Sequence, residues 1–164
     1  MKRFVIAVYV ENKYGVLARV TGMFMRRGFN IDSLTVGETD DPKFSRITIT
    51  LNGDDYAREQ LINQLKKLYN VKIVKLLENE ATVERELMLI KVNNTPENKE
   101  KITASVEAYH ATIMDCTSDA VCVEVVGEPS KINNFIRLMQ PLGIVEMCRT
   151  GVVALELGNS IMEK

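Results

Sequence analysis

Hydrophobic positions in the first half of the chain change period several times, which predicts the order strand, helix, strand, strand, helix, strand. An apolar run at 3–10 is rich in β-branched and aromatic residues, as a buried strand would be. Apolar residues then recur at helical spacing over 16–24, and Gly28 predicts the end of that helix. The remaining predicted elements are strands at 30–38, 44–51 and 71–77 and a helix at 54–68.

The second half of the chain repeats this order. Thr95 and Pro96 are typical of a helix start, with a capping hydroxyl followed by proline at the first helical position. Pro129 opens the last helix in the same way, and Gly151 suggests a bend in the final extended segment. The predicted elements are a strand at 86–92, helices from 96 and 129, hairpin strands at 111–117 and 120–126, and extended segments at 144–147 and 152–157.

The order βαββαβ occurs twice along the chain, which predicts an α+β fold of two ferredoxin-like domains at residues 1–77 and 84–164. A polar linker at 78–84 joins the two domains. Each domain is expected to have a four-stranded antiparallel sheet with both helices on one face. The first strand, however, is apolar on both faces, so its second face must also be covered. A second copy of the chain, the other domain or a partner protein would cover it, and we expect that the chain does not work as a lone monomer.

Composition narrows the possible functions. Of the 164 residues 46% are hydrophobic and 26% are charged, which is typical of a globular protein. The net charge of -1 gives no reason to expect a nucleic-acid partner. The N-terminal apolar run is too short for a membrane helix and is followed by Glu11 and Asn12 instead of a cleavage site, so we expect a cytoplasmic protein. One histidine and three scattered cysteines, which we expect to fill strands as small apolar residues, give no metal-ligand spacing.

The segment ENKYGVLARV, at 11–20, carries the main candidate chemistry. The first turn of a helix offers unpaired N–H groups and a partial positive charge that favour an anion. Gly15 lets a ligand approach the backbone, and Asn12 offers a carbonyl to an ammonium group and an NH₂ to a carboxylate. Leu17 and Val36 are candidates for an apolar wall. A free amino acid with a hydrocarbon side chain fits these groups.

Simpler interpretations of the same residues stay open. Asn12 and Gly15 are also common in tight connections that bind nothing. Asn30, just past Gly28, is either a turn residue or a second polar contact. A small enzyme would have to use the only histidine, His110, which no cysteine or carboxylate cluster accompanies.

Five segments give the chain a specific resemblance to a known family. They are GVLARV, RRGFNIDSLTVG, DDPKFSRITI, ATVERELMLIKV and RTGVVALELG, and they are spread over nearly the whole length. Together they resemble the small regulatory subunit of acetolactate synthase (acetohydroxyacid synthase). The resemblance implies that residues 1–77 form an ACT domain, a ferredoxin-like module that binds amino acids, and that 84–164 form the second domain typical of this subunit.

The resemblance also implies a function. Members of this family are not catalytic; they dimerise through the ACT domain, activate a catalytic large subunit and confer feedback inhibition by valine in branched-chain amino-acid biosynthesis. It places no cofactor on this chain and assigns thiamine diphosphate, magnesium and FAD to the large subunit. A stand-alone ACT-type sensor that controls another protein is the alternative. Leucine and isoleucine stay open as secondary effectors, since one methylene changes affinity by only about 1–3 kcal/mol.

The resemblance finally assigns the ligand contacts. By position in the motif they fall on Asn12, Gly15 and Asn30, in a site between the ACT domains of two chains. The residues that line the same loop are Lys13, Tyr14, Val16 and Leu17, with Val36 as the remaining candidate from the residue types.

Overall fold

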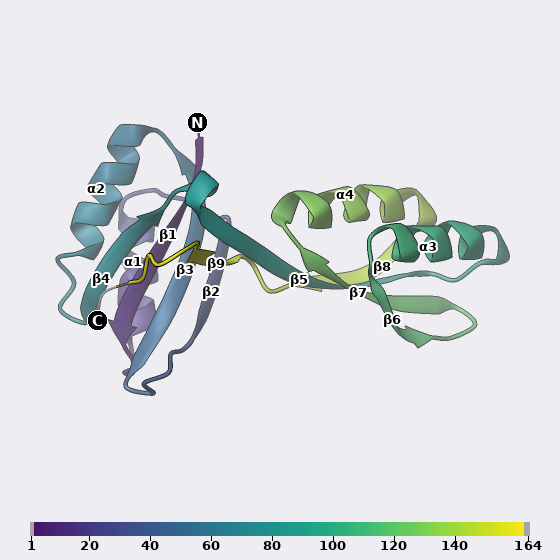
Figure 1. Ribbon diagram of the computed structural model, residues 1–164, viewed down its shortest axis with the longest axis horizontal. Coiled ribbons are helices and arrows are strands. Elements are labelled where there is room, and N and C mark those ends of the chain that lie inside the picture. The colour runs from purple at the N-terminus through teal and green to yellow at the C-terminus, as the bar shows by residue number, and fades with distance from the viewer. Residues whose placement is uncertain (1, 163–164) are drawn as a thin grey trace. The chain divides into compact units, whose positions relative to one another are not determined.

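The computed structural model describes residues 2–162, which form two compact units. The first contains residues 2–83 together with 152–162, and the second contains residues 84–151. Both units have an antiparallel sheet with two helices on one face, so the predicted α+β fold of two ferredoxin-like domains is confirmed (Figure 1).

The sheet of the first unit has the strand order β2-β3-β1-β4. Its strands are β1 (Lys2–Glu11), β2 (Ser33–Glu38), β3 (Phe44–Gly53) and β4 (Val71–Leu77), and its helices are α1 (Val16–Arg26) and α2 (Asp55–Leu65). β1 lies antiparallel to both β3 and β4, and β2 pairs with β3 only, so β2 is an edge strand.

The alternation of side chains along β1 separates two cores. Phe4, Ile6 and Val8 face the helices and pack with apolar residues of α1 and α2. Asp54 fixes the start of α2, because its side chain accepts the N–H of Ala57 at 2.7 Å. The core between the sheet and the helices is therefore formed by the apolar positions whose spacing predicted these strands and helices.

The other face of β1 is covered by the chain's own C-terminal segment. Val152 and Ala154 are buried in one cluster with Val5, Ala7 and Leu77. The segment contains a short strand, β9 (Val153–Glu156), which pairs with β5 and crosses this face of the first unit (Figure 1). The second apolar face of β1 thus gives no independent reason to expect a partner chain.

This packing moves residues 152–162 out of the expected second domain and into the first unit. The physical reason is burial, since Val152 and Ala154 are 4% and 5% exposed where they meet the first sheet. The ends of the expected ranges, residue 1 and residues 163–164, lie outside the described part of the chain.

The second unit repeats the architecture. Its sheet has the order β6-β7-β5-β8 and consists of β5 (Thr82–Asn93), β6 (Thr112–Cys116), β7 (Ala120–Gly127) and β8 (Ile144–Arg149). The helices α3 (Pro96–Ala108) and α4 (Pro129–Met139) pack on one face around Ile132 and Phe135. Short 3₁₀ turns lie at Asn79–Ala81 and Gln140–Leu142, and β5 begins inside the predicted linker, at Thr82.

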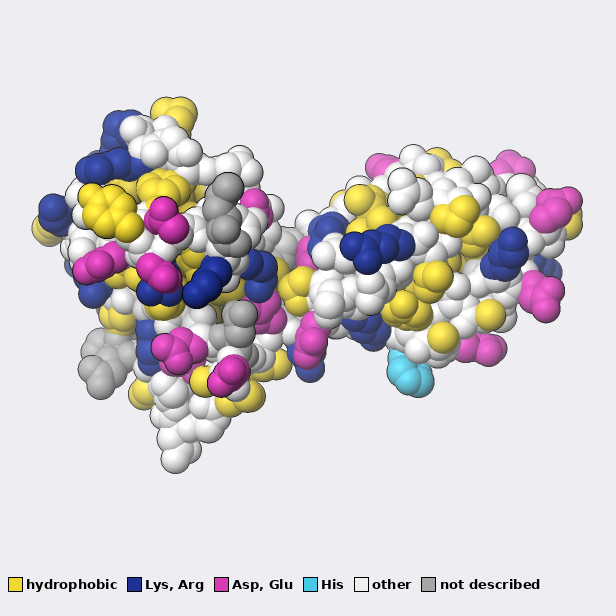
Figure 2. Space-filling view, turned by 90° about the horizontal axis from the view of Figure 1, so that it is seen from above, with side chains coloured by type: hydrophobic (Ala, Val, Ile, Leu, Met, Phe, Trp, Pro, Cys, Tyr) yellow, Lys and Arg dark blue, Asp and Glu magenta, His cyan; other side chains and the backbone are white. Residues whose placement is uncertain are grey.

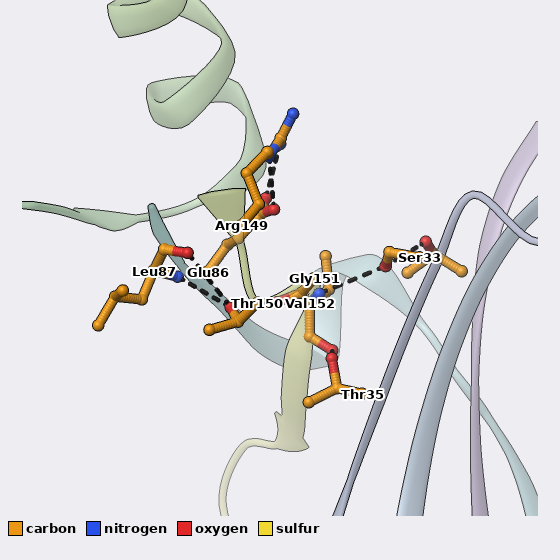
Figure 3. Close-up of polar contacts among 9 residues, drawn as sticks. Ser33, Thr35, Glu86, Leu87, Arg149, Thr150, Gly151 and Val152 are labelled. Atoms are coloured by element: carbon orange, nitrogen blue, oxygen red, sulfur yellow. Dashed lines mark hydrogen bonds and ion pairs between the residues drawn. The ribbon is translucent and has the colours of Figure 1, made fainter. Parts of the chain in front are cut away.

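Polar contacts hold the chain on both sides of the point where it leaves the second unit (Figure 3). In the second unit, Arg149 donates to the buried Glu86 through Nε and an Nη atom, at 2.7 and 2.8 Å. Gly151 has a φ of 82°, which gives the predicted bend. In the first unit, the N–H of Val152 donates to Ser33 Oγ at 3.3 Å, and its carbonyl accepts from Thr35 Oγ1 at 3.0 Å.

Candidate functional site

The loop between β1 and α1 forms a helix start without a side-chain cap. Gly15 has a φ of 77° and occupies the N-cap position, so no side chain covers the first turn of α1. The carbonyl of Gly15 accepts the N–H of Arg19 at 3.0 Å, and Val16 donates to the carbonyl of Lys13 at 3.3 Å. Within the described chain, neither a side-chain cap nor an acidic residue of the first turn meets the next N–H groups. This arrangement favours an anionic group in front of the helix.

The side chain of Asn12 is bound to the end of β2 and to the turn before β3. Its Nδ2 donates to Glu38 Oε1 and to the carbonyl of Pro42, each at 3.0 Å. Both amide hydrogens are thereby used, and the side-chain carbonyl remains as an acceptor. Of the two predicted roles of Asn12, binding an ammonium group fits this geometry, whereas binding a carboxylate is left to the helix N–H groups.

An ionic network fixes the end of β1 beside the loop. Glu11 accepts from Lys72 at 2.7 Å, from Lys13 at 2.9 Å and from Asn70 at 2.8 Å. These hydrogen bonds, with that from Lys72 the strongest, lower the pKa of Glu11 to about 2. Asn70 in turn accepts from Arg19 of α1 at 2.9 Å. The network connects the loop, the first helix and β4.

The two apolar candidates are partly exposed, as a ligand wall must be. Leu17 is 39% exposed on the first turn of α1, and Val36 is 45% exposed on β2. Val36 pairs with Ile47, whose side chain lies in the helix-covered core, so Val36 points to the same face as α1. Val16, by contrast, is 4% exposed in that core, so only its backbone is available to a ligand. Tyr14 is 105% exposed and its side chain points away from the loop into solvent.

Asn30 does not join this group within one chain. It lies past the C-terminal end of α1, whereas Asn12 and Gly15 lie before the start of that helix. A helix of 11 residues is about 16 Å long. Asn30 is exposed at the far end. A site that contains Asn30, Asn12 and Gly15 therefore requires a second copy of the chain.

The sequence did not point to Glu38 and Pro42 as partners of Asn12. They belong to the end of β2 and to the turn before β3, and the pairing of β3 with both β1 and β2 places them beside Asn12. No spacing between residues 12, 38 and 42 carries that information.

Other candidate chemistry is absent from the described residues. Residues 2–162 contain no group of three His, Cys, Asp or Glu side chains placed to hold a metal ion. His110 is exposed at the end of α3. The three cysteines lie in strands, as expected, but Cys116 and Cys148 are exposed and Cys122 is half-buried, so they are not packed as apolar filler.

Two further observations concern the surface. Basic and acidic side chains are interspersed with apolar ones on the visible face of each unit, without a continuous basic stripe (Figure 2). Every helix in the described range is too short or too polar to span a bilayer.

Comparison with known proteins agrees with the fold. Residues 6–73 match a family model described as the AHAS small subunit-like ACT domain, and residues 85–158 match one described as the small subunit of acetolactate synthase. The chain is 50% identical over 155 residues to a probable acetolactate synthase small subunit of Archaeoglobus fulgidus, covering 94% of this chain and 96% of that protein. It is 40% identical over 161 residues to the acetolactate synthase isozyme 3 small subunit of Escherichia coli, covering 98% and 99%.

A solved structure gives the same result. The acetolactate synthase small subunit of Thermotoga maritima superposes with a TM-score of 0.90 at 38% identity, covering 98% of this chain and 100% of that one. The chain is thus a two-domain protein whose first unit contains an ACT domain. It belongs to the acetolactate synthase small-subunit family.

Proposed function

We propose that this chain is the non-catalytic regulatory subunit of an acetolactate synthase and that its β1–α1 loop binds valine as a feedback effector. The observation that carries the proposal is the uncapped start of α1 beside the unused carbonyl oxygen of Asn12. An N–H donor group and a carbonyl acceptor at this loop complement the two charged ends of a free amino acid.

The ligand is held by both ends and by its side chain. Its carboxylate meets the N–H groups after Gly15, its ammonium meets Asn12 Oδ1, and its isopropyl group packs on Leu17 and Val36. Burying a valine side chain contributes about 1.5–3 kcal/mol, and charged hydrogen bonds add roughly 1.5–3 kcal/mol each. Association opposes this by at least about 4 kcal/mol. The balance gives binding in the micromolar to millimolar range, which suits the sensing of a metabolite.

Two copies of the chain complete the site. β2 is an edge strand, so its outer N–H and C=O groups face away from its own sheet. If two copies pair antiparallel along β2, a two-fold axis brings Asn30 of one copy toward Asn12 and Gly15 of the other. In this arrangement Asn30 of one copy meets the loop of the other, although Asn30 and the loop are far apart within one chain. The binding site is therefore formed by the homodimer.

Catalysis takes place on the large subunit. We propose that the large subunit holds thiamine diphosphate, magnesium and FAD and performs the condensation that leads to branched-chain amino acids. The small subunit raises its activity. Valine reverses this effect only if it binds one arrangement of the ACT dimer more tightly than another, because equal binding would shift no equilibrium.

Reconstitution with a purified large subunit tests the proposal. The small subunit alone should form no acetolactate, should raise the activity of the large subunit, and should make that activity sensitive to valine. Acetolactate formation by this chain alone would refute the regulatory role. Failure to change the activity of its own large subunit would favour a stand-alone sensor, and calorimetry that detects no valine binding to the dimer would refute the effector site.

A further inference from the structure

The loop between α2 and β4 concentrates positive charge on the first unit. Residues 60–77 contain four lysines and no acidic residue, although the whole chain has a net charge of -1. Lys66 and Lys67 follow the end of α2, and Lys72 lies near the start of β4. Positive charge is therefore segregated at this place in the chain and is not balanced by neighbouring carboxylates in the sequence.

The two lysines of β4 have partners from other parts of the first unit. Lys75 is ion-paired with Glu156. Lys72 Nζ lies 2.7 Å from a carboxylate oxygen of Glu11, and Lys13 Nζ lies 2.9 Å from the other oxygen. One carboxylate therefore faces two ammonium groups, so the pairing around Glu11 leaves an excess of positive charge beside the loop.

The loop itself carries a large aromatic side chain among exposed cations. Tyr69 is 83% exposed, and Lys72 Nζ lies 5.4 Å from the centroid of its ring. Lys66 and Lys67 are exposed and pair with no carboxylate in the described part of the chain. Lysines also protect edge strands and complement the C-terminal end of a helix, but neither role requires an exposed tyrosine between them.

The backbone that carries Tyr69 is fixed by its neighbour Asn70, which is 8% exposed. The carbonyl of Asn70 accepts the N–H of Glu11 at 2.9 Å, and its side chain donates to the Glu11 carboxylate at 2.8 Å. The same side chain accepts from Arg19 of α1 at 2.9 Å. A residue on a backbone that is ordered before binding loses less conformational entropy when a partner covers it. Tyrosine is also one of the residue types that contribute most to binding at protein interfaces.

The place of this loop in the sheet indicates which partner it can meet. β4 is the edge strand opposite to β2, so a dimer that pairs along β2 leaves the α2–β4 loop of each copy uncovered (Figure 1). A second copy is not a suitable occupant of the loop, because two identical basic surfaces repel each other. The charge is confined to one loop of a chain with a pI of about 5.9, whereas nucleic-acid binding proteins usually carry an extended basic surface. A protein surface with carboxylates around an apolar pocket complements the loop.

We propose that Lys66, Lys67, Tyr69 and Lys72 form a docking surface for an acidic surface of the catalytic large subunit. The ring of Tyr69 is the anchor that enters the pocket of the partner, and the lysines lie opposite carboxylates around it. The charges accelerate and orient the encounter, and the buried ring supplies most of the affinity. This inference rests on the proposed function, since it requires a large subunit as the partner.

Binding of the full chain to the purified large subunit, measured by biolayer interferometry at low and high salt, tests the surface. Tyr69→Ala should weaken the affinity at least about tenfold, mainly through faster dissociation. The double variant Lys66→Glu, Lys67→Glu should slow association about tenfold and make it less dependent on salt. Binding by both variants that equals binding by the parent protein would refute the surface.

Matched variants separate the surface from general effects of charge and folding. Tyr56→Ala removes another exposed tyrosine, near the start of α2, and Lys99→Glu with Lys101→Glu makes the same change of charge on α3. Both controls should bind the large subunit like the parent protein, and equal losses in them would overturn the assignment. Tyr69→Ala should keep the melting temperature and the valine affinity of the parent protein, which excludes a loss of structure as the cause of weaker docking.

The possible results distinguish this inference from the proposed function. If the parent protein does not bind the large subunit at all, both are refuted. If the parent protein binds and activates the large subunit and the Tyr69 and lysine variants do so equally well, only the docking surface is refuted. If the lysine variant loses binding to a DNA duplex or to phosphatidylglycerol vesicles but keeps full binding to the large subunit, the occupant is a nucleic acid or a membrane, and the proposal is wrong.

Discussion

Asn12 Nδ2 lies 3.0 Å from Glu38 Oε1, and this contact joins the loop before α1 to the end of β2. Together with the bond to the carbonyl of Pro42 it fixes the orientation of the Asn12 amide. The side-chain carbonyl consequently points away from these partners. An asparagine that would otherwise rotate freely is thereby preorganised as an acceptor.

Replacing Asn12 should separate valine sensitivity from activation. In Asn12→Ala the acceptor for the ligand ammonium and the tie to Glu38 are both lost, so valine affinity should fall at least about tenfold. Activation of the large subunit should remain, because the loop holds the effector and not the partner. Titration calorimetry and the reconstituted assay measure the two effects. Asn63→Ala, an exposed asparagine of α2, is the matched control, and an unaltered valine response in Asn12→Ala would remove Asn12 from the site.

Glu11 should make stability depend on acid pH. Its pKa falls from an ordinary value of 4.5 to about 2 in the folded protein, so the folded state binds its proton less readily than the unfolded state. The stabilisation from Glu11 is therefore complete above about pH 4.5 and is lost as the pH falls toward 2. Glu11→Gln should melt at a lower temperature than the parent protein at pH 7. The difference between the two melting temperatures should shrink as the pH is lowered through this window, and a constant difference would contradict this role of Glu11.

The Glu86–Arg149 pair should matter most when only one partner is removed. Glu86 is 4% exposed, so Arg149→Ala leaves a buried carboxylate without its counter-ion. We expect a loss of roughly 2–3 kcal/mol in the free energy of unfolding, measured by urea denaturation. The double variant Glu86→Leu, Arg149→Leu removes both charges and should lose less. A double variant that is less stable than Arg149→Ala would contradict the desolvation argument.

Two neighbouring residues of β9 test the packing of the C-terminal segment. Ala154 is 5% exposed against the first sheet, whereas Leu155 is 59% exposed. Ala154→Asp buries a charge beside Val5 and Ala7 and should destabilise the first unit by about 2–4 kcal/mol. Leu155→Asp should change stability by no more than about 0.5 kcal/mol. If both variants unfold at the same urea concentration, the segment does not pack as described.

The sequence predicted the elements well because each depends on local patterns. The predicted strand Val71–Leu77 agrees with the structure at both ends, and the helix predicted from residue 54 begins at Asp55. The doubly apolar β1 correctly indicated a second covered face. It could not indicate that residues 152–162 provide the cover, because the contact joins distant parts of the chain through burial and not through any periodicity.

The candidate site was predictable in its residue types but not in its geometry. Gly15 and Asn12 were recognisable from their place before a helix. Whether the amide of Asn12 was free depended on the turn that contains Pro42, which no local pattern connects to it. The separation of Asn30 from Gly15 follows from the length of α1, and it shows why one chain alone does not form the proposed valine site.

The position of Val152 and Ala154 has a consequence for protein synthesis. The ribosome makes β1 first and the segment that covers it only after the whole second unit has been translated. Until then the nascent first unit exposes Val5, Ala7 and Leu77 as a bare apolar surface. Folding of the first unit is therefore completed last, after the unit that follows it in the chain has emerged.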